Sequence, residues 1–138
     1  MTNDKEENPL KILIVDDDKE FLDFIRGEFL LHRQYQVYTA SDEDNGLSMA
    51  KEVLPDIILL DVMMPGKGGL DVLRELKEDQ NTSVIPVAML TAVGSFEARL
   101  QALRLYCEGY IEKPCTCQEI ISVIETVINR RIECRSKI

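Results

Sequence analysis

The sequence has no apolar stretch long enough to cross a membrane and no recognisable export signal. A membrane-spanning helix needs about 20 mostly apolar residues, and no run in this chain approaches that length. The first residues, MTNDKEENPL, lack the basic start and the apolar centre of a secretory signal peptide. We therefore expect a cytoplasmic protein with no membrane partner.

Basic residues are also scarce, with 16 lysines and arginines against 25 acidic residues and a net charge of −9. A nucleic-acid-binding surface needs a basic stripe or patch, so we expect no nucleic acid to be bound directly. Cations and basic protein partners remain compatible with this charge.

Internal repeats, low-complexity tracts and linkers are absent as well. A chain of 138 residues suits one domain with a real core. We expect a loosely held N-terminal segment at 1–9, a domain at 10–131 and a C-terminal tail at 132–138.

Metal-binding cysteine and histidine patterns are missing too. The chain has four cysteines, of which three cluster late in the sequence, and its single histidine, His32, lies far from that cluster. This spacing does not fit a zinc site. Reduced structural thiols are the favoured interpretation in a cytosolic protein, and redox regulation through the Cys115-Thr116-Cys117 segment stays open.

What the chain does contain is a regular alternation of two kinds of segment. Short runs rich in Ile, Leu, Val and Tyr occur at 11–15, 36–40, 56–60, 86–90 and 109–113. Between them, apolar residues recur at helical spacing, as in Phe21, Ile25, Phe29; Leu70, Leu73, Leu76; Phe96, Leu100, Leu103; and Ile120, Ile124, Val127. The helix at about 42–53 has the weakest pattern, because Asn45-Gly46 interrupts it. This alternation predicts an α/β fold with a parallel sheet covered by helices on both faces.

Polar residues follow the apolar runs at the points where the strands should end. The first run ends in Asp16, Asp17 and Asp18, the third in Asp61, the fourth in Thr91, and the fifth leads into Lys113. In parallel sheets these positions share one edge, where ligands usually bind.

Each of these residues also has a simpler explanation. Asp17 or Asp18 could cap the next helix, and Asp61 could only begin a turn. Thr91 could simply finish a strand, and Lys113 could be a solvated surface residue. Their occurrence together at one edge favours a site.

Clustered carboxylates at this edge would repel one another. Two unit charges about 4 Å apart interact by roughly 4 kcal/mol at an effective dielectric of 20, so either one acid is protonated or a cation lies among them. A hard cation such as Mg²⁺ suits oxygen ligands. With the cation bound, Asp61 could stay ionised and attack a phosphoryl group, forming an aspartyl phosphate.

Four motifs carry a resemblance to a known family: ILIVDDD, LLDVMMPG, MLTA and YIEKP occur in this order over nearly the whole chain. The chain resembles a response-regulator receiver domain of two-component signalling, similar to the chemotaxis regulator. The resemblance implies a flavodoxin-like (βα)5 fold with strand order 2-1-3-4-5. It also implies a protein that takes a phosphoryl group from a histidine kinase or a phosphotransfer protein and that is not an enzyme acting on other substrates.

By position in these motifs, the resemblance assigns the phosphorylation and metal sites. Asp61 matches the phospho-acceptor, and Asp16 and Asp17 match the acidic pair that holds Mg²⁺. Met63 matches the residue whose backbone carbonyl completes the metal site. The implied cofactor is Mg²⁺.

The resemblance also implies a switch. Thr91 matches the switch hydroxyl, Lys113 the phosphate-pairing lysine, and Tyr110 the aromatic residue that rotates inward on activation. The bond before Pro114 is usually cis in this family. The switched surface would be formed by the fourth helix, the fifth strand and the fifth helix, and would bind a downstream protein target, an output domain or a second phosphorylated copy.

Other readings compete with a working receiver. A flavodoxin-like carrier would need a hydroxyl- and glycine-rich phosphate loop after the first strand, where DDDKE would repel a cofactor phosphate. A phosphatase with an aspartyl nucleophile usually has a second acid where this chain has Met63. A degenerate receiver that only docks partners is disfavoured by the complete residue set. Only RRIECRSKI follows the last helical pattern, so both a stand-alone receiver and a domain cut from a longer regulator stay open.

Overall fold

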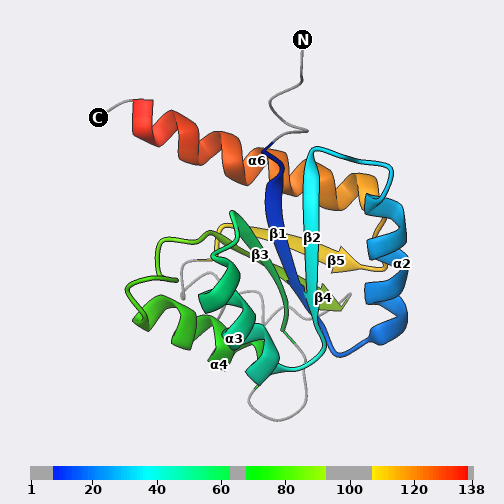
Figure 1. Cartoon of the computed structure of the whole chain (residues 1–138), viewed down its shortest axis with the longest axis horizontal. Coiled ribbons are helices and arrows are strands. Elements are labelled where there is room, and N and C mark those ends of the chain that lie inside the picture. The colour runs from blue at the N-terminus through cyan, green and yellow to red at the C-terminus, as the bar shows by residue number, and fades with distance from the viewer. Residues whose placement is uncertain (1–7, 63–67, 93–106, 137–138) are drawn as a thin grey trace.

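The computed structural model describes residues 8–62, 68–92 and 107–136. Its centre is a five-stranded parallel sheet in the order β2-β1-β3-β4-β5 (Figure 1). The strands are β1 (Leu10–Val15), β2 (Tyr35–Ala40), β3 (Ile57–Asp61), β4 (Val87–Ala92) and β5 (Gly109–Lys113). The predicted fold class and strand order are therefore confirmed.

Helices cover both faces of this sheet (Figure 1). The described helices are α2 (Lys19–Phe29), α3 (Glu43–Val53), α4 (Gly68–Glu78) and α6 (Cys117–Ser136). Helices α2 and α6 pack together on one face, and α3 and α4 pack on the other. The helix expected around Phe96, Leu100 and Leu103 lies outside the described residues. Within the described ranges, no helix is both long enough and apolar enough to span a membrane.

The last helix is longer than the predicted domain. Helix α6 continues to Ser136, whereas the sequence pattern places the end of the domain at 131. The limits of the domain at 10–131 and of the tail at 132–138 stay predictions.

The central strands are continuously apolar because both of their faces are covered. In β1, Ile12 and Ile14 pack in the cluster beneath α2 and α6, while Leu13 and Val15 pack beneath α3 and α4. All four side chains are at most 1% exposed. Alternate residues of a strand point to opposite faces, so a doubly covered strand has no position left for a polar side chain until it ends.

Helix α2 begins directly after the acidic run. The side chain of Asp18 accepts a hydrogen bond from the backbone N–H of Phe21 at 3.1 Å and so caps the helix. Leu22, Ile25 and Phe29 are buried, whereas Phe21 is half-buried against the same core. The predicted stripe is thus correct for Ile25 and Phe29.

The glycine that interrupts the pattern of α3 has a packing reason. A Cβ atom at Gly46 would lie 2.8 Å from a methyl group of Val15 in β1, closer than side-chain carbons approach. Asp42 caps this helix by accepting a hydrogen bond from the backbone N–H of Asn45 at 2.8 Å. The helix predicted at 42–53 is therefore present, and its glycine lets it lie close to the sheet.

Candidate functional site

The carboxyl ends of three strands bring acidic and basic side chains together. Asp16 follows β1, Asp61 is the last residue of β3, and Lys113 is the last residue of β5. Asp16 is completely buried and Asp61 is 6% exposed. Charged groups with so little exposure to water need partners, because an unpaired buried charge is costly.

Three carboxylates meet at this edge. Asp16, Asp17 and Asp61 each place an oxygen so that all three oxygens lie within 4.8 Å of one another. Asp17 is exposed, whereas the other two are buried. At such separations each pair of charges repels by several kcal/mol in a partly buried setting. Together with Lys113, these three residues form what we call the acidic site.

Among the described residues, Lys113 is the cation that lies beside these carboxylates. Its ammonium group forms an ion pair with the Oδ2 atom of Asp16 and lies 3.7 Å from the Oδ2 atom of Asp61. Burial by itself would lower the pKa of Lys113, but the hydrogen bond and charge of Asp16, with the charges of Asp61 and Asp18, raise this pKa above its ordinary value. The lysine therefore remains positively charged at neutral pH.

The loop after β1 contacts the second carboxylate oxygen of Asp16. The backbone N–H of Asp18 donates to the Oδ1 atom of Asp16 at 2.9 Å. Beyond the ion pair with Lys113, the buried Oδ2 atom of Asp16 receives no hydrogen bond from residues 8–62, 68–92 or 107–136. The capping role that the sequence left open between Asp17 and Asp18 belongs to Asp18.

Gly69 supports the site but is not among the residues predicted from the sequence. A Cβ atom at this position would lie 1.9 Å from the backbone carbonyl oxygen of Asp61, well inside van der Waals contact. The N–H of Gly69 donates to the carbonyl of Val62 at 3.1 Å, so the start of α4 rests directly on the end of β3. The glycine pair Gly68-Gly69 was the available signal, since such pairs often mark close backbone approach.

The remaining predicted residues are only partly described. Thr91 lies in β4 and its backbone pairs with Glu112 of β5, but its side chain is outside what the structure describes. Tyr110 is half-buried against the cluster under α3 and α4. Met63 lies outside the described residues. The peptide bond between Lys113 and Pro114 is cis, as expected.

A family model for the response regulator receiver domain matches residues 12–125 of this chain. The chain belongs to the response regulator receiver family. Among curated proteins, this receiver domain is 38% identical over 120 residues to the transcriptional regulatory protein CpxR of Klebsiella pneumoniae, a match covering 87% of this chain and 50% of CpxR. The chain thus spans about half the length of that relative.

Solved structures agree with this assignment. A receiver domain protein from Clostridium thermocellum has 31% identity and a TM-score of 0.80, with 91% of this chain and 98% of that chain covered. The chemotaxis protein CheY4 of Vibrio cholerae has 25% identity and a TM-score of 0.78, with 86% and 98% covered.

Membership of the family carries a general function. Response regulator receiver domains are signalling phospho-acceptors of two-component systems, and they generally bind Mg²⁺ at an acidic pocket. The clustered carboxylates of Asp16, Asp17 and Asp61 match the composition of such an acidic pocket. One relative is named a transcriptional regulatory protein, so the expectation that no nucleic acid is bound directly is not supported.

Proposed function

We propose that this receiver domain takes a phosphoryl group onto Asp61 from a histidine kinase or a phosphotransfer protein. The observation that carries the proposal is the position of Asp61, which is 6% exposed, lies 3.7 Å from the ammonium group of Lys113 and shares a cluster with two further carboxylates. A carboxylate oxygen of Asp61 attacks phosphorus and forms a new O–P bond. The bond from phosphorus to the donor breaks, and its electron pair leaves with the donor.

The donor set fits Mg²⁺. Asp16, Asp17 and Asp61 supply hard oxygen ligands, which Mg²⁺ prefers, and within the described part of the chain the buried Oδ2 atom of Asp16 is paired with the Lys113 ammonium alone. We assign these three residues as metal-binding, with the backbone carbonyl of Met63 as a further ligand outside the described residues. When bound, the ion supplies positive charge that offsets the charge on the phosphoryl oxygens.

Lys113 and Thr91 act on the phosphoryl oxygens. Lys113 keeps its positive charge because its pKa is raised, and its ammonium group is near enough to Asp61 to pair with an attached phosphoryl group. Thr91 directly follows Leu90, the register partner of Asp61, in β4 and supplies a hydroxyl donor. Both residues stabilise the product rather than perform turnover on another substrate, so the protein is a phospho-acceptor and not an enzyme in the usual sense.

Phosphorylation changes the surface beside β5. A phosphoryl group adds about −1.5 to −2 charges and new acceptor oxygens, toward which Thr91 and Lys113 move. Tyr110 then turns inward and alters the face formed by β5, α6 and the segment at 93–106, which is outside the described residues. A partner that prefers the altered face shifts the population toward it. That partner is a downstream protein, an output domain or a second copy of the chain, in the cytoplasm.

The direct test is incubation with Mg²⁺ and acetyl phosphate, followed by measurement of the intact mass. We expect a gain of one phosphoryl group in the native chain and no gain in Asp61→Asn, whose side chain is nearly isosteric. Omission of Mg²⁺ should suppress the gain.

Uptake by the Asp61→Asn variant would contradict the proposed acceptor. A native chain that binds Mg²⁺ without gaining mass, and is also inert with histidine kinases, would instead indicate a degenerate receiver that only docks its partners.

A further inference from the structure

An aromatic ring lies over the lysine of the acidic site. The ammonium group of Lys113 is 4.7 Å from the centroid of the Phe21 ring, which belongs to the first turn of α2. Cations are attracted to the face of an aromatic ring within about 6 Å of its centroid, and more strongly where water is excluded. The side chain of Lys113 is only 23% exposed, so this contact is partly shielded from water.

The contact closes a ring of interactions through four residues. The Oδ1 atom of Asp16 accepts from the N–H of Asp18 at 2.9 Å, and the Oδ1 atom of Asp18 accepts from the N–H of Phe21 at 3.1 Å. The Phe21 ring contacts the Lys113 ammonium, which is paired with the Oδ2 atom of Asp16. The acidic loop, the start of α2 and the end of β5 are therefore joined at one point.

We propose that Phe21 is a positioning residue for phosphorylation, holding the Lys113 ammonium group against Asp16 and beside Asp61. The proposal rests on the proposed function of Asp61 as phospho-acceptor. It adds a residue from outside the four sequence motifs, in a role that those motifs do not assign.

The need for such a residue follows from the chemistry of lysine. Its four-carbon stem is flexible, and an ammonium group is a compact charge with no preferred planar geometry, so ion pairing alone fixes its position poorly. Both Asp16 and the Phe21 ring contact the ammonium group, which lies 3.7 Å from the Oδ2 atom of Asp61. A group held in place loses less freedom when it pairs with the transferred phosphoryl oxygens.

The position of the ring is itself well defined. Phe21 is half-buried and packs against the core beneath α2 and α6. Its backbone N–H is tied to the capping side chain of Asp18. Packing alone accounts for a large apolar side chain here, but it does not account for a charged group lying on the ring face.

Fluorinated phenylalanines separate the two roles. Fluorine atoms withdraw electron density from the ring face and weaken the attraction for a cation, while they change the shape of the side chain little. We would place mono-, di- and trifluorinated phenylalanine at position 21 by site-specific incorporation and prepare Phe21→Leu beside them. The readout is the rate constant for phosphorylation by acetyl phosphate at saturating Mg²⁺, followed by intact mass.

We expect the rate constant to fall stepwise with each added fluorine, and Phe21→Leu to react about three- to tenfold more slowly than the native chain. Phe24→Leu is the matched control, because Phe24 lies on the same helix but is 53% exposed. Its rate should equal that of the native chain. Urea unfolding of every variant checks that the fold is retained.

The outcomes are distinct. If the native chain reacts but the fluorinated series is flat, Phe21 serves packing only and the inference is overturned, even where Phe21→Leu is slow or unfolded. If the native chain itself takes up no phosphoryl group from any donor, the proposed function fails first. A graded fluorine dependence with an unchanged Phe24→Leu rate supports the assignment.

Discussion

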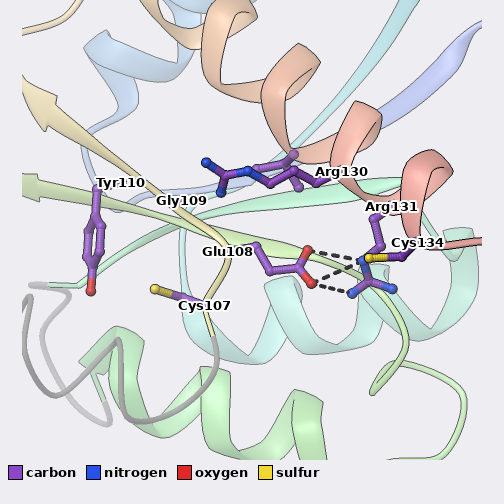
Figure 2. A pocket seen from close by; sticks show the side chains of 8 residues that line it. Cys107, Glu108, Gly109, Tyr110, Arg130, Arg131 and Cys134 are labelled. Atoms are coloured by element: carbon purple, nitrogen blue, oxygen red, sulfur yellow. Dashed lines mark hydrogen bonds and ion pairs between the residues drawn. The ribbon is translucent and has the colours of Figure 1, made fainter. Parts of the chain in front are cut away.

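The two ends of the sheet treat their charged residues differently. At the carboxyl end, Asp16, Asp17 and Asp61 crowd together, and the described residues bring Lys113 as a cation. At the amino end of β5, Glu108 forms an ion pair with Arg131 of α6, with its two carboxylate oxygens each 3.1 Å from the Nε atom of Arg131 (Figure 2). The second arrangement balances its charges, and the first concentrates one sign.

At the amino end of the sheet, backbone carbonyl groups also accept hydrogen bonds from charged side chains. Three consecutive residues shortly before β4 present their carbonyl groups to cations: Lys77 donates to Ser83 and Ile85 at 3.4 and 3.1 Å, and Arg131 donates to Val84 at 2.8 Å. Together with Glu108, we call these contacts the amino-end network. Figure 2 shows that the pair of Glu108 and Arg131 borders a pocket between β5 and α6.

This difference separates a structural role from a functional one. Every charge named in the amino-end network has a partner supplied by the chain, so the network joins α4, α6 and the start of β4 without further components. In the acidic site the carboxylates repel one another, and an added cation would stabilise them. Excess charge of one sign at a strand end is therefore the better indicator of function.

The largest expected effect comes from adding a methyl group where α4 approaches the backbone of Asp61. Gly69→Ala would push a methyl group into the carbonyl of Asp61, because the added Cβ would lie 1.9 Å from that oxygen. We expect the free energy of unfolding to fall by about 3 kcal/mol, measured by urea denaturation. Gly27→Ala in α2 is the control, since nothing lies within 4 Å of its Cβ, and it should add about 0.5–1 kcal/mol. Equal effects at the two glycines would argue against the close approach.

Mg²⁺ should stabilise the folded chain by binding at the carboxyl end of the sheet only. At a concentration of Mg²⁺ about 100 times its dissociation constant, we expect the free energy of unfolding to rise by about 2.7 kcal/mol, seen as an increase in melting temperature. Asp16→Asn should lose this response, whereas Glu108→Gln, far from the carboxylates, should keep it. A response lost equally in both variants would contradict a local site.

Neutralising one acid at each end should change stability in opposite directions when Mg²⁺ is absent. Asp17→Asn relieves repulsion among the carboxylates, and we expect it to raise the free energy of unfolding by about 1 kcal/mol. Glu108→Gln leaves Arg131 without its charged partner and should lower that free energy by about 1 kcal/mol. Denaturant unfolding in chelator measures both. The same sign for the two variants would remove the contrast between the ends.

The smallest expected effect is in the alkaline dependence of stability. The pKa of Lys113 lies above its ordinary value of 10.5, so its stabilising charge is present below that pH and is lost as the pH rises through the pKa in the folded state. The pKa of Lys77 lies below 10.5, chiefly because of burial, so stability rises between its folded pKa and 10.5.

Two variants without Mg²⁺ isolate these slopes. Between about pH 9 and 11, Lys113→Met should make the decline of stability with pH shallower, and Lys77→Met should make it steeper. Chemical denaturation at each pH measures the slope. Slopes that change in the same direction in both variants would contradict the opposite pKa shifts of the two lysines.

Much of this molecule follows from local pattern. Alternating apolar and helical segments predicted the strands and the described helices, because a doubly covered strand is a short continuous apolar run and an amphipathic helix repeats its apolar residues with a period of 3.6. The acidic run after β1 and the single acid after β3 predicted a shared edge, since parallel strands all end on the same side. Even the weak helix at 42–53 was predicted correctly, although the packing of Gly46 on Val15 was not.

Other features depend on segments that are far apart in the chain. The amino-acid sequence by itself determined the α/β class, the sheet order through its family motifs, and which acids reach the carboxyl edge. Only the tertiary structure decided that Asp18 rather than Asp17 caps α2, that Gly69 must lack a side chain, and that Phe21 covers Lys113. The reason is physical: periodicity reports which face a residue occupies, whereas the contact between a ring on α2 and an ammonium group on β5 exists only once both elements have packed on the sheet.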